Sequence, residues 1–412
     1  MYTPTSPIRI LFVSHDGGMA GAQQTLLTFL EGLDRTLIAP HLVVPYLGEL
    51  SMRVSELDIP VTTRDLLHWA PCVGDPRQFN KWSHFWRSLK SIRARAWSIA
   101  ALVERHSIDL IYTNTVTCVE GAIAARMTGK PHVWHIHEPL LGNSELKPLY
   151  PMWFYSLAIN HLSTHIIFPS HTLAKCYPAL RSKASVVHNG LRMPLKFDRE
   201  PARKEIAAWI NIDTSKQWVA IVGAIQPRKD HYTFINAAKI ILEKCDNAHF
   251  LIVGTGSQYF TQQLKKQIQE TGIAERITLA GRWPGSISTL LSAVDVLAIS
   301  SEQESFGLTA IESLAVGTPV VSTRCGGPEE IIDDEKNGYL VDLKNSPALG
   351  QAILELLRDP KTRQRMGEAG RAKVESMFGQ ENYVTRIQDI LQAAYFGTPI
   401  GESSPSEDRN NT

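Results

Sequence analysis

The sequence has 412 residues, of which 43% are hydrophobic and 20% are charged, and its formal net charge is +1. This length is enough for two α/β domains that each have a full core, and the composition is that of an ordinary soluble protein. Because the net charge is close to zero, composition gives no electrostatic argument for binding to nucleic acid.

The N-terminal residues predict a strand rather than a signal peptide. Ile8–Val13 is too short for the apolar core of a signal peptide, and no charged segment precedes it. No apolar run approaches the roughly 20 residues that span a bilayer, so any membrane contact is expected to be peripheral. The five cysteines include no C-x-x-C pair, which argues against a zinc site or disulfide framework and favours reduced thiols in a cytosol.

A glycine-rich turn at residues 15–24 separates this strand from an amphipathic helix. A turn between a first strand and a first helix is a place where a phosphate or sugar can approach backbone N–H groups. The turn matches neither the dinucleotide motif nor the P-loop, and a flexible turn without a ligand is the alternative. We therefore treat Gly21 as a candidate contact.

Residues 76–103 contain no acidic residue, and their cations alternate with apolar side chains at steps of three and four. This pattern predicts a long amphipathic helix with a basic polar face. One interpretation is a crossover helix that packs on the sheet while its cations are solvated. The other is that its basic, Trp-rich end docks on an anionic membrane surface.

Residues 131–138 predict a strand that ends in His137 and Glu138. Open α/β sheets bind ligands at the carboxyl ends of their strands, so His137 is a candidate contact, with a structural histidine as the alternative. His135 and His137 share one side of the strand and suggest a metal, but no further ligands are evident. Asn189-Gly190 is interpreted as a turn that closes the first domain.

A second domain begins with a predicted strand at residues 218–222, followed by a loop that contains Arg228 and Lys229. Adjacent cations in such a loop can pair with a diphosphate, whereas solvated surface cations are the alternative. Later predicted strands end in Gly254 and in Gly281-Arg282.

Residues 294–327 predict a strand, a polar loop, a helix, a second strand and a glycine turn. Phe306, Gly307 and Leu308 are expected to hold the first helical turn, whose free N–H groups favour an anion. Glu304 precedes this helix and Glu312 lies within it. Because carboxylates repel phosphate, we interpret both as acceptors for sugar and ribose hydroxyls, the alternative being solvated surface charges.

The motif Ser301-x-x-Glu304-Ser305-Phe306-Gly307-Leu308 with Glu312, followed by Gly317-Thr318-Pro319-Val320-Val321 and Gly326-Gly327, closely resembles retaining glycosyltransferases of family 4. The resemblance implies an α/β protein of the GT-B fold, with two Rossmann-like doubly wound domains that face a central cleft. It implies an acceptor-binding domain at 1–190, to which residues 378–396 cross back, and a nucleotide-sugar-binding domain at 191–377. Residues 397–412 are polar and are expected to form a disordered tail.

The resemblance also implies roles for individual residues. Glu304, His137 and Lys229 would be catalytic, with Lys229 and Arg228 holding the diphosphate as it leaves. The implied donor-binding residues are Gly21, Arg228, Lys229, Gly254, Arg282, Ser305, Phe306, Gly307, Leu308 and Glu312. The family has a Gly-Arg dipeptide where this sequence has Gly223-Ala224, so one cation is missing, and Arg228, Arg282 or Arg324 is expected to compensate.

The implied reaction transfers a sugar from a UDP- or GDP-linked donor to a glycan or lipid-linked acceptor, with retention of configuration and no metal or other cofactor. No nucleic acid is implied as a partner. We expect a cytoplasmic protein with peripheral contact to the inner face of the plasma membrane through residues 76–103. A GT-B nucleotide-sugar epimerase and a catalytically weak binding or assembly subunit at the membrane are the alternatives, and Ala224 keeps the second one open.

Overall fold

The computed structural model describes residues 6–70, 81–143, 146–194 and 198–400, and for residues 81–90 it describes the backbone alone. Contacts between residues divide the chain into two compact units. The first unit contains the described residues up to Pro169, Ala174–His188 and the residues from Glu381 onward. The second contains Ser170–Leu173 and Asn189–Gln380. Residues 401–412 of the predicted tail lie outside the described residues.

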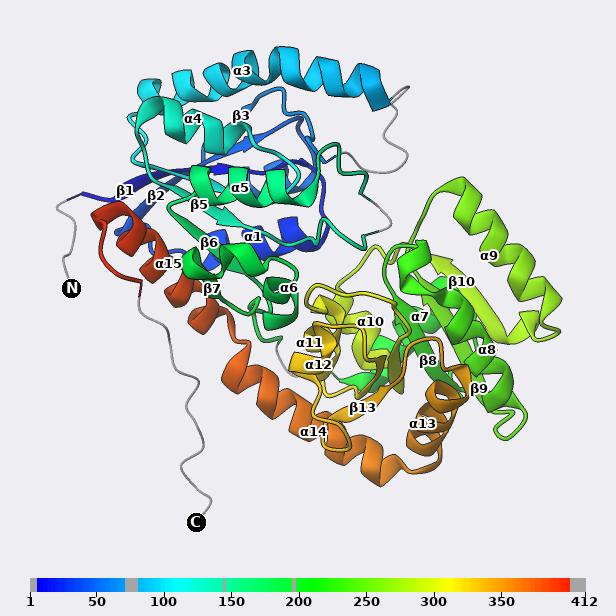
Figure 1. Ribbon diagram of the computed structural model, residues 1–412. Helices are drawn as coiled ribbons and strands as arrows, with labels where there is room; N and C mark the ends of the chain where they lie inside the picture. The colour runs from blue at the N-terminus through cyan, green and yellow to red at the C-terminus, as the bar shows by residue number, and fades with distance from the viewer. Residues whose placement is uncertain (1–5, 71–80, 144–145, 195–197, 401–412) are drawn as a thin grey trace. The chain divides into compact units, whose positions relative to one another are not determined.

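The first unit contains a seven-stranded parallel sheet in the order β3-β2-β1-β4-β5-β6-β7 (Figure 1). Its strands are β1 (Ile8–Val13), β2 (Ile38–Val44), β3 (Val61–Thr63), β4 (Leu110–Thr113), β5 (His132–His135), β6 (His165–Phe168) and β7 (Ala184–Val186). Its helices are α1 (Gly21–Gly32), α2 (Glu49–Ser55), α3 (Lys81–Arg105), α4 (Glu120–Thr128), α5 (Met152–Leu162) and α15 (Gln380–Phe396), while α6 (His171–Lys175) spans the change between units.

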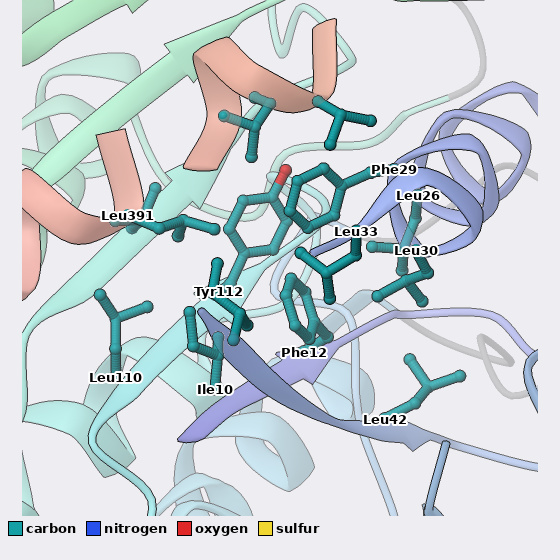
Figure 2. Packing of buried hydrophobic residues seen from close by; sticks show 14 of the residues in the cluster. Ile10, Phe12, Leu26, Phe29, Leu30, Leu33, Leu42, Leu110, Tyr112 and Leu391 are labelled. Carbon is teal, nitrogen blue, oxygen red and sulfur yellow. The ribbon is translucent and has the colours of Figure 1, made fainter. Parts of the chain in front are cut away.

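Alternation along β1 builds a core on each face of this sheet. Ile10 and Phe12 pack with side chains of α1 and α15, as Figure 2 shows, and Leu11 and Val13 pack with side chains of α3 and α4. Successive strand residues point to opposite faces, so one short apolar strand can serve both cores. Burying each large apolar side chain contributes about 1.5–3 kcal/mol. Among the α15 residues in this core, Leu391 is fully buried.

The second unit contains a six-stranded parallel sheet in the order β10-β9-β8-β11-β12-β13. Its strands are β8 (Gln217–Val222), β9 (Ala248–Val253), β10 (Ile277–Gly281), β11 (Val296–Ile299), β12 (Val320–Thr323) and β13 (Gly338–Val341). Its helices are α7 (Arg199–Ile210), α8 (His231–Leu242), α9 (Gln258–Glu270), α10 (Ile287–Ala293), α11 (Leu308–Ala315), α12 (Pro328–Ile331), α13 (Ser346–Arg358) and α14 (Pro360–Met377).

Helices cover both faces of the second sheet as well. Val219 and Ile221 of β8 pack with residues of α8 and α13, whereas Trp218 and Ala220 pack with residues of α7 and α10. Each unit is therefore a doubly wound, Rossmann-like α/β domain, which confirms the predicted fold class.

The structure corrects the expected solvation of the α3 cations. Arg95 was expected on a solvated basic face, but its side chain is 6% exposed and its Nε lies 2.7 Å from Oε1 of Glu120. Arg93 and Trp97 are exposed, whereas Ile99 and Leu102 are buried in the core that contains Leu11 of β1. Residues 76–80 and the side chains of 81–90 lie outside the described residues. From residue 91 onward, α3 is thus a packed crossover helix that keeps some exposed basic and aromatic groups.

Two further details differ from the sequence-based expectation. No helix was expected at α5, whose apolar residues extend round the helix rather than along one stripe. The sequence pattern predicts a helix only over Leu264–Glu270, but α9 begins at Gln258 because the Ser257 side chain caps it by accepting from the Phe260 N–H. Within the described part of the chain, no helix combines the length and the apolar character needed to cross a bilayer.

Candidate functional site

In the second unit, two loops that carry predicted site residues meet where the strand order reverses, between β8 and β11. Open α/β sheets bind ligands at the carboxyl ends of the strands at this point. The loop after β8 carries Arg228 and Lys229, and the loop after β11 carries Glu304. The Ser300 hydroxyl donates to the Lys229 carbonyl at 2.9 Å, so the two loops hold each other in place.

Glu304 lies between two cations and a hydroxyl group. Its Oε1 is 2.5 Å from Nζ of Lys229, and its Oε2 is 3.3 Å from a guanidinium nitrogen of Arg228. The Ser301 hydroxyl donates to Oε1 at 2.6 Å. Burial by itself raises the pKa of Glu304, but the charges of Lys229 and Arg228 and the hydrogen bonds from Lys229 and Ser301 together lower it below its usual value.

This cluster places one ionised carboxylate beside two cations. The sequence analysis assigned Lys229 to a diphosphate and Glu304 to sugar hydroxyls, and the structure adds that the two groups pair directly. An anion that approaches Lys229 would have to compete with Glu304 for the ammonium group. Arg228, Arg282 and Arg324 were suggested as substitutes for the missing cation. Of these three, Arg228 pairs with Glu304 in this cluster.

The start of helix α11 lies next to this cluster, and it corrects one expectation. Phe306 and Gly307 precede the helix rather than forming its first turn, because α11 begins at Leu308. Gly307 has φ +104°, a left-handed conformation that favours glycine. The N–H groups at the start of an α-helix have no intrahelical acceptor, and they favour a negative charge.

The loop after β12 fixes the position of this helix start. The Gly327 N–H donates to the Glu304 carbonyl at 2.9 Å, and the Glu304 N–H donates to the Cys325 carbonyl at 2.8 Å. A Cβ atom on Gly327 would lie 2.2 Å from the Cα of Phe306, so the backbones approach too closely for any other residue. The Ser305 carbonyl accepts from the Ser170 hydroxyl at 2.5 Å. Four backbone and side-chain contacts therefore hold this segment in one conformation.

Glu312 lies one helical turn further along α11 and is buried, with 9% of its surface exposed. No hydrogen-bond partner for its carboxyl group is found among the described residues, and burial raises its pKa to about 7. A buried carboxyl group without a partner is unfavourable when it is ionised. It is therefore suited to accept hydrogen bonds from hydroxyl groups of a ligand.

The remaining predicted donor-binding residues of this unit are spread more widely. Gly254 follows β9 at φ +144°, and a Cβ atom there would lie 1.9 Å from the Gly223 carbonyl oxygen. Arg282 is exposed and follows β10, so β9 and β8 lie between its strand and β11. Arg324 forms an ion pair with Asp334 at 2.8 Å. Gly254 is thus part of the tightly packed loops after β8 and β9, whereas Arg282 follows a strand further from β11 and Arg324 pairs with Asp334.

Gly21 and His137 belong to the first unit, where Asn114 connects their two segments. The Asn114 amide nitrogen donates to the Ala22 carbonyl at 2.8 Å, and its oxygen lies 2.9 Å from Nε2 of His137. Because the amide nitrogen is used by Ala22, His137 donates from Nε2 and keeps Nδ1 as an acceptor. Gly21 is exposed at the first position of α1. These residues follow β1, β4 and β5, at the point where this sheet reverses its strand order.

Neutral imidazoles surround this position. The rings of His15 and His68 lie 5.5 Å apart, and those of His135 and His137 lie 4.0 Å apart. Burial, together with the charge of a neighbouring histidine, lowers the pKa of both His15 and His137 to about 3. The imidazoles of this site are therefore neutral at neutral pH. The Tyr112 hydroxyl and Nδ1 of His135 form a hydrogen bond of 2.5 Å. His135 of the His-x-His pair therefore has a structural role.

Asn114, His15 and Ser301 were not singled out as site residues by the sequence analysis. Each of them is a polar residue that follows a predicted parallel strand by no more than two positions. That pattern was sufficient to find them, because the carboxyl ends of parallel strands share one edge of the sheet. Glu138 shows the same pattern, and burial raises the pKa of its carboxyl group to about 7.

Comparison with known proteins agrees with this arrangement. The family model described as glycosyl transferases group 1 matches residues 202–373, and the model described as glycosyltransferase family 4 matches residues 19–193. An uncharacterized glycosyltransferase of Methanocaldococcus jannaschii is 23% identical over 86% of this chain and 97% of its own length. A D-inositol 3-phosphate glycosyltransferase of Segniliparus rotundus is 34% identical, over 48% of this chain and 44% of its own length.

A solved structure of Anabaena HepE in complex with UDP-glucose has a TM-score of 0.77 and 21% identity, covering 94% of this chain and 100% of that one. At this identity the likeness shows the fold alone. The two family models match consecutive parts of the chain that correspond to the two units. The chain therefore belongs to the glycosyltransferases of family 4, group 1, with the GT-B fold.

Proposed function

We propose that this glycosyltransferase transfers a hexose from a nucleotide-sugar donor to a glycan or lipid-linked glycan acceptor, with retention of the anomeric configuration. The observation that carries the proposal is the Lys229–Glu304–Arg228 cluster beside the start of α11, at the strand reversal of the second unit. It combines two cations, which suit a diphosphate, with a carboxylate, which suits sugar hydroxyls. UDP is the favoured nucleotide because the HepE structures hold UDP or UDP-glucose, with GDP as the alternative.

In this proposal, Lys229 and Arg228 stabilise the diphosphate as the bond between its oxygen and the anomeric carbon breaks. The electron pair of that bond goes to the diphosphate oxygen, so negative charge grows where the cations and the first N–H groups of α11 lie. These residues supply the charge stabilisation themselves, and the proposal requires no metal ion or other cofactor. Glu304 is released from Lys229 as the diphosphate binds, and it then accepts hydrogen bonds from the sugar.

Glu312 and His137 complete the proposed set. Glu312 accepts from the ribose hydroxyls, which provides its buried carboxyl group with partners. His137 is neutral, and its Nδ1 accepts from a hydroxyl of the transferred sugar or the acceptor, which orients the reacting groups. A neutral imidazole suits this role because sugar hydroxyls carry no charge.

Peripheral membrane contact from the cytoplasmic side is a further part of the proposal. The side chain of Trp97 on α3 is 63% exposed, and Trp153 and Leu157 on α5 are 67% and 61% exposed. Exposed Trp and Leu with nearby cations such as Arg93 are typical of proteins that bind anionic bilayer surfaces. Sedimentation with phosphatidylglycerol vesicles should retain the wild type, and Trp153→Ser with Leu157→Ser should weaken it. Equal retention on phosphatidylcholine vesicles would argue against this part.

The proposed donor chemistry is tested by nucleotide binding and donor turnover together. UDP, GDP, UDP-glucose, UDP-N-acetylglucosamine and GDP-mannose are screened by thermal shift, because a ligand of the native state raises the unfolding midpoint. Slow hydrolysis of the binding donor is then measured without an acceptor. Binding with hydrolysis supports the transferase. Binding without turnover under any condition would favour a non-catalytic subunit, and a C2-epimerised product would favour an epimerase.

A further inference from the structure

The second unit has a cavity of about 480 Å³ at the edge of its sheet opposite Glu304. Asp295 immediately precedes β11 and Gly317 comes shortly before β12, so the cavity lies at the amino ends of these strands. Glu304 follows the carboxyl end of β11. Since a four-residue strand spans about 13 Å, the cavity and the Lys229–Glu304 cluster are separate places.

Three arginines line the cavity: Arg199, Arg363 and Arg371. Arg199 lies on α7, and the other two lie on α14 at positions eight residues apart. Arg199 and Arg363 approach the same oxygen of Asp295, with nitrogen–oxygen distances of 2.6 and 3.4 Å. Arg199 and Arg363 therefore converge from two helices on one carboxylate oxygen.

Asp295 cannot neutralise all of this positive charge. Its other oxygen is 3.3 Å from the buried guanidinium of Arg203 and accepts from the Trp218 N–H at 2.8 Å. One carboxylate thus faces three guanidinium groups. Burial lowers the pKa of the Arg363 guanidinium. Asp295 raises this pKa, whereas the charge of Arg199 lowers it. The cations outnumber the anion even before Arg371 is counted.

Within the described residues, the hydrogen-bond partners of Arg371 are two neutral carbonyl groups. Its guanidinium donates to the Ala315 carbonyl at 2.6 Å and to the Pro194 carbonyl at 3.4 Å. Glu368, which is exposed, is the other carboxylate of the lining. The lining of the cavity thus holds three guanidinium groups and two carboxylates, and the cavity is large enough for a small ligand.

We propose that this arginine-lined cavity binds the phosphate group of a small soluble molecule, as a second anion site distinct from the nucleotide-sugar site. Guanidinium groups form paired, charge-assisted hydrogen bonds to phosphate, and partial burial strengthens them relative to bulk water. The Arg199 side chain is 41% exposed, so it can rotate toward such a ligand. Asp295 would then still be paired with Arg203 and Arg363. The proposal does not depend on the proposed transferase activity.

Helix α11 gives the site a physical connection to the opposite edge of the sheet. Its first turn lies beside Glu304, and its last carbonyl, that of Ala315, is held by Arg371. Val316 and Gly317, which follow the helix, line the cavity. A phosphate that binds Arg371 would therefore compete with the Ala315 carbonyl for this guanidinium, at the C-terminal end of the helix that carries Glu312.

The test is a titration of the full chain with inorganic phosphate at constant ionic strength, with chloride as the reference salt. Thermal shift and calorimetry are applied to wild type, Arg199→Gln/Arg363→Gln and Glu368→Gln. Arg365→Gln, an exposed arginine of α14 outside the cavity lining, is the matched control. Lys229→Met removes the other place where phosphate would bind.

We expect a saturable rise in the unfolding midpoint that persists in Arg365→Gln and Lys229→Met. The double variant should bind phosphate at least about tenfold more weakly, since each lost charge-assisted hydrogen bond has that effect. Glu368→Gln should bind phosphate more tightly, a gain that loss of folding cannot produce. No saturable binding, its loss in Lys229→Met, or an unchanged affinity in both the double variant and Glu368→Gln would overturn the proposal.

Discussion

The two units share one topology, yet the residues at their strand-reversal points differ in charge. In the second unit, Lys229 and Arg228 surround the ionised Glu304. In the first unit, the corresponding loops hold the neutral groups His15, His137 and Asn114. The carboxyl groups of Asp16 and Glu138 lie beside them, but the described contacts of His137 include no lysine or arginine partner. A charged cluster suits an ionic ligand group such as a diphosphate, whereas neutral donors and acceptors suit hydroxyl groups. The difference indicates that the same scaffold presents two chemically distinct sets of groups at its strand-reversal points.

The largest expected effect comes from removing the charge that sets the two regions apart. Lys229→Met should lower kcat/KM for the nucleotide sugar by about 10³-fold, because a group that stabilises charge in the transition state is lost. It should also remove the UDP-induced thermal shift. The matched control is Lys239→Met, which removes an exposed lysine of α8 in the same unit. If Lys229→Met and the control turned over the donor equally, the charged site would have no role in catalysis.

The second prediction uses the buried carboxyl group of the charged region. Burial raises the pKa of Glu312 from its usual value of 4.5 to about 7, so the folded state binds the proton more tightly. Stability from this group is therefore present at low pH and is lost as pH rises, by about 2 kcal/mol between pH 5 and 8. Glu312→Gln should flatten this dependence and weaken UDP binding.

Denaturant unfolding at several pH values measures the effect of Glu312→Gln. Glu270→Gln is the control, because the Glu270 side chain is 65% exposed. An unchanged pH dependence in Glu312→Gln would mean that the carboxyl group is not buried in solution. Unchanged UDP affinity would remove Glu312 from the donor site.

The third prediction concerns the region of the neutral histidines. His137→Asn should lower turnover by about 10- to 100-fold, because a group that orients the reacting atoms is lost. UDP affinity should stay unchanged, since no charge facing the diphosphate is removed. Asn114→Ala should have a smaller effect of the same kind, because the His137 ring then loses the acceptor for its Nε2 proton. Isothermal titration with UDP and a donor-consumption assay separate the two effects, and a parallel loss of both would contradict the division of roles.

The smallest expected effect is the acid sensitivity of the neutral histidines. The pKa of His15 is about 3 in the folded state, below its usual value of 6.5. Its contribution to stability is therefore complete above pH 6.5 and is lost as pH falls from 6.5 toward 3, reaching about 1.4 kcal/mol at pH 5.5. His15→Gln should lose that much less stability on acidification. The exposed His161→Gln is the control, and equal slopes for both variants would show that His15 is not buried in solution.

Much of the fold followed from local patterns in the sequence. The short apolar runs at Ile8–Val13 and Val296–Ile299, each followed by polar or glycine residues and a helical pattern, predicted parallel strands that the structure contains. Helix α5 did not follow, because its apolar residues lie all round the helix and give no amphipathic period. The placement of α15 in the core of the first unit had no local signal either, and only the family resemblance suggested it.

Candidate site residues were predicted where a polar residue follows a strand, but their partners were not. The sequence placed Arg228, Lys229, Glu304 and His137 on loops. It gave no sign that Glu304 pairs with Lys229 or that Asn114 orients His137, because these contacts join segments 75 and 23 residues apart. The cluster of Arg199, Arg363 and Asp295 likewise unites three distant segments.

By itself, the sequence determined the fold class, the identity of the strands and the edge of each sheet on which ligand groups gather, since these depend on period and on local order along the chain. The tertiary structure decided which charges meet and which are buried. The pKa of Glu312, the neutrality of His137 and the excess of guanidinium groups around Asp295 all depend on burial and on neighbours from other elements. Electrostatic free energy depends on distance and on exclusion of water, and neither can be read from positions along a chain.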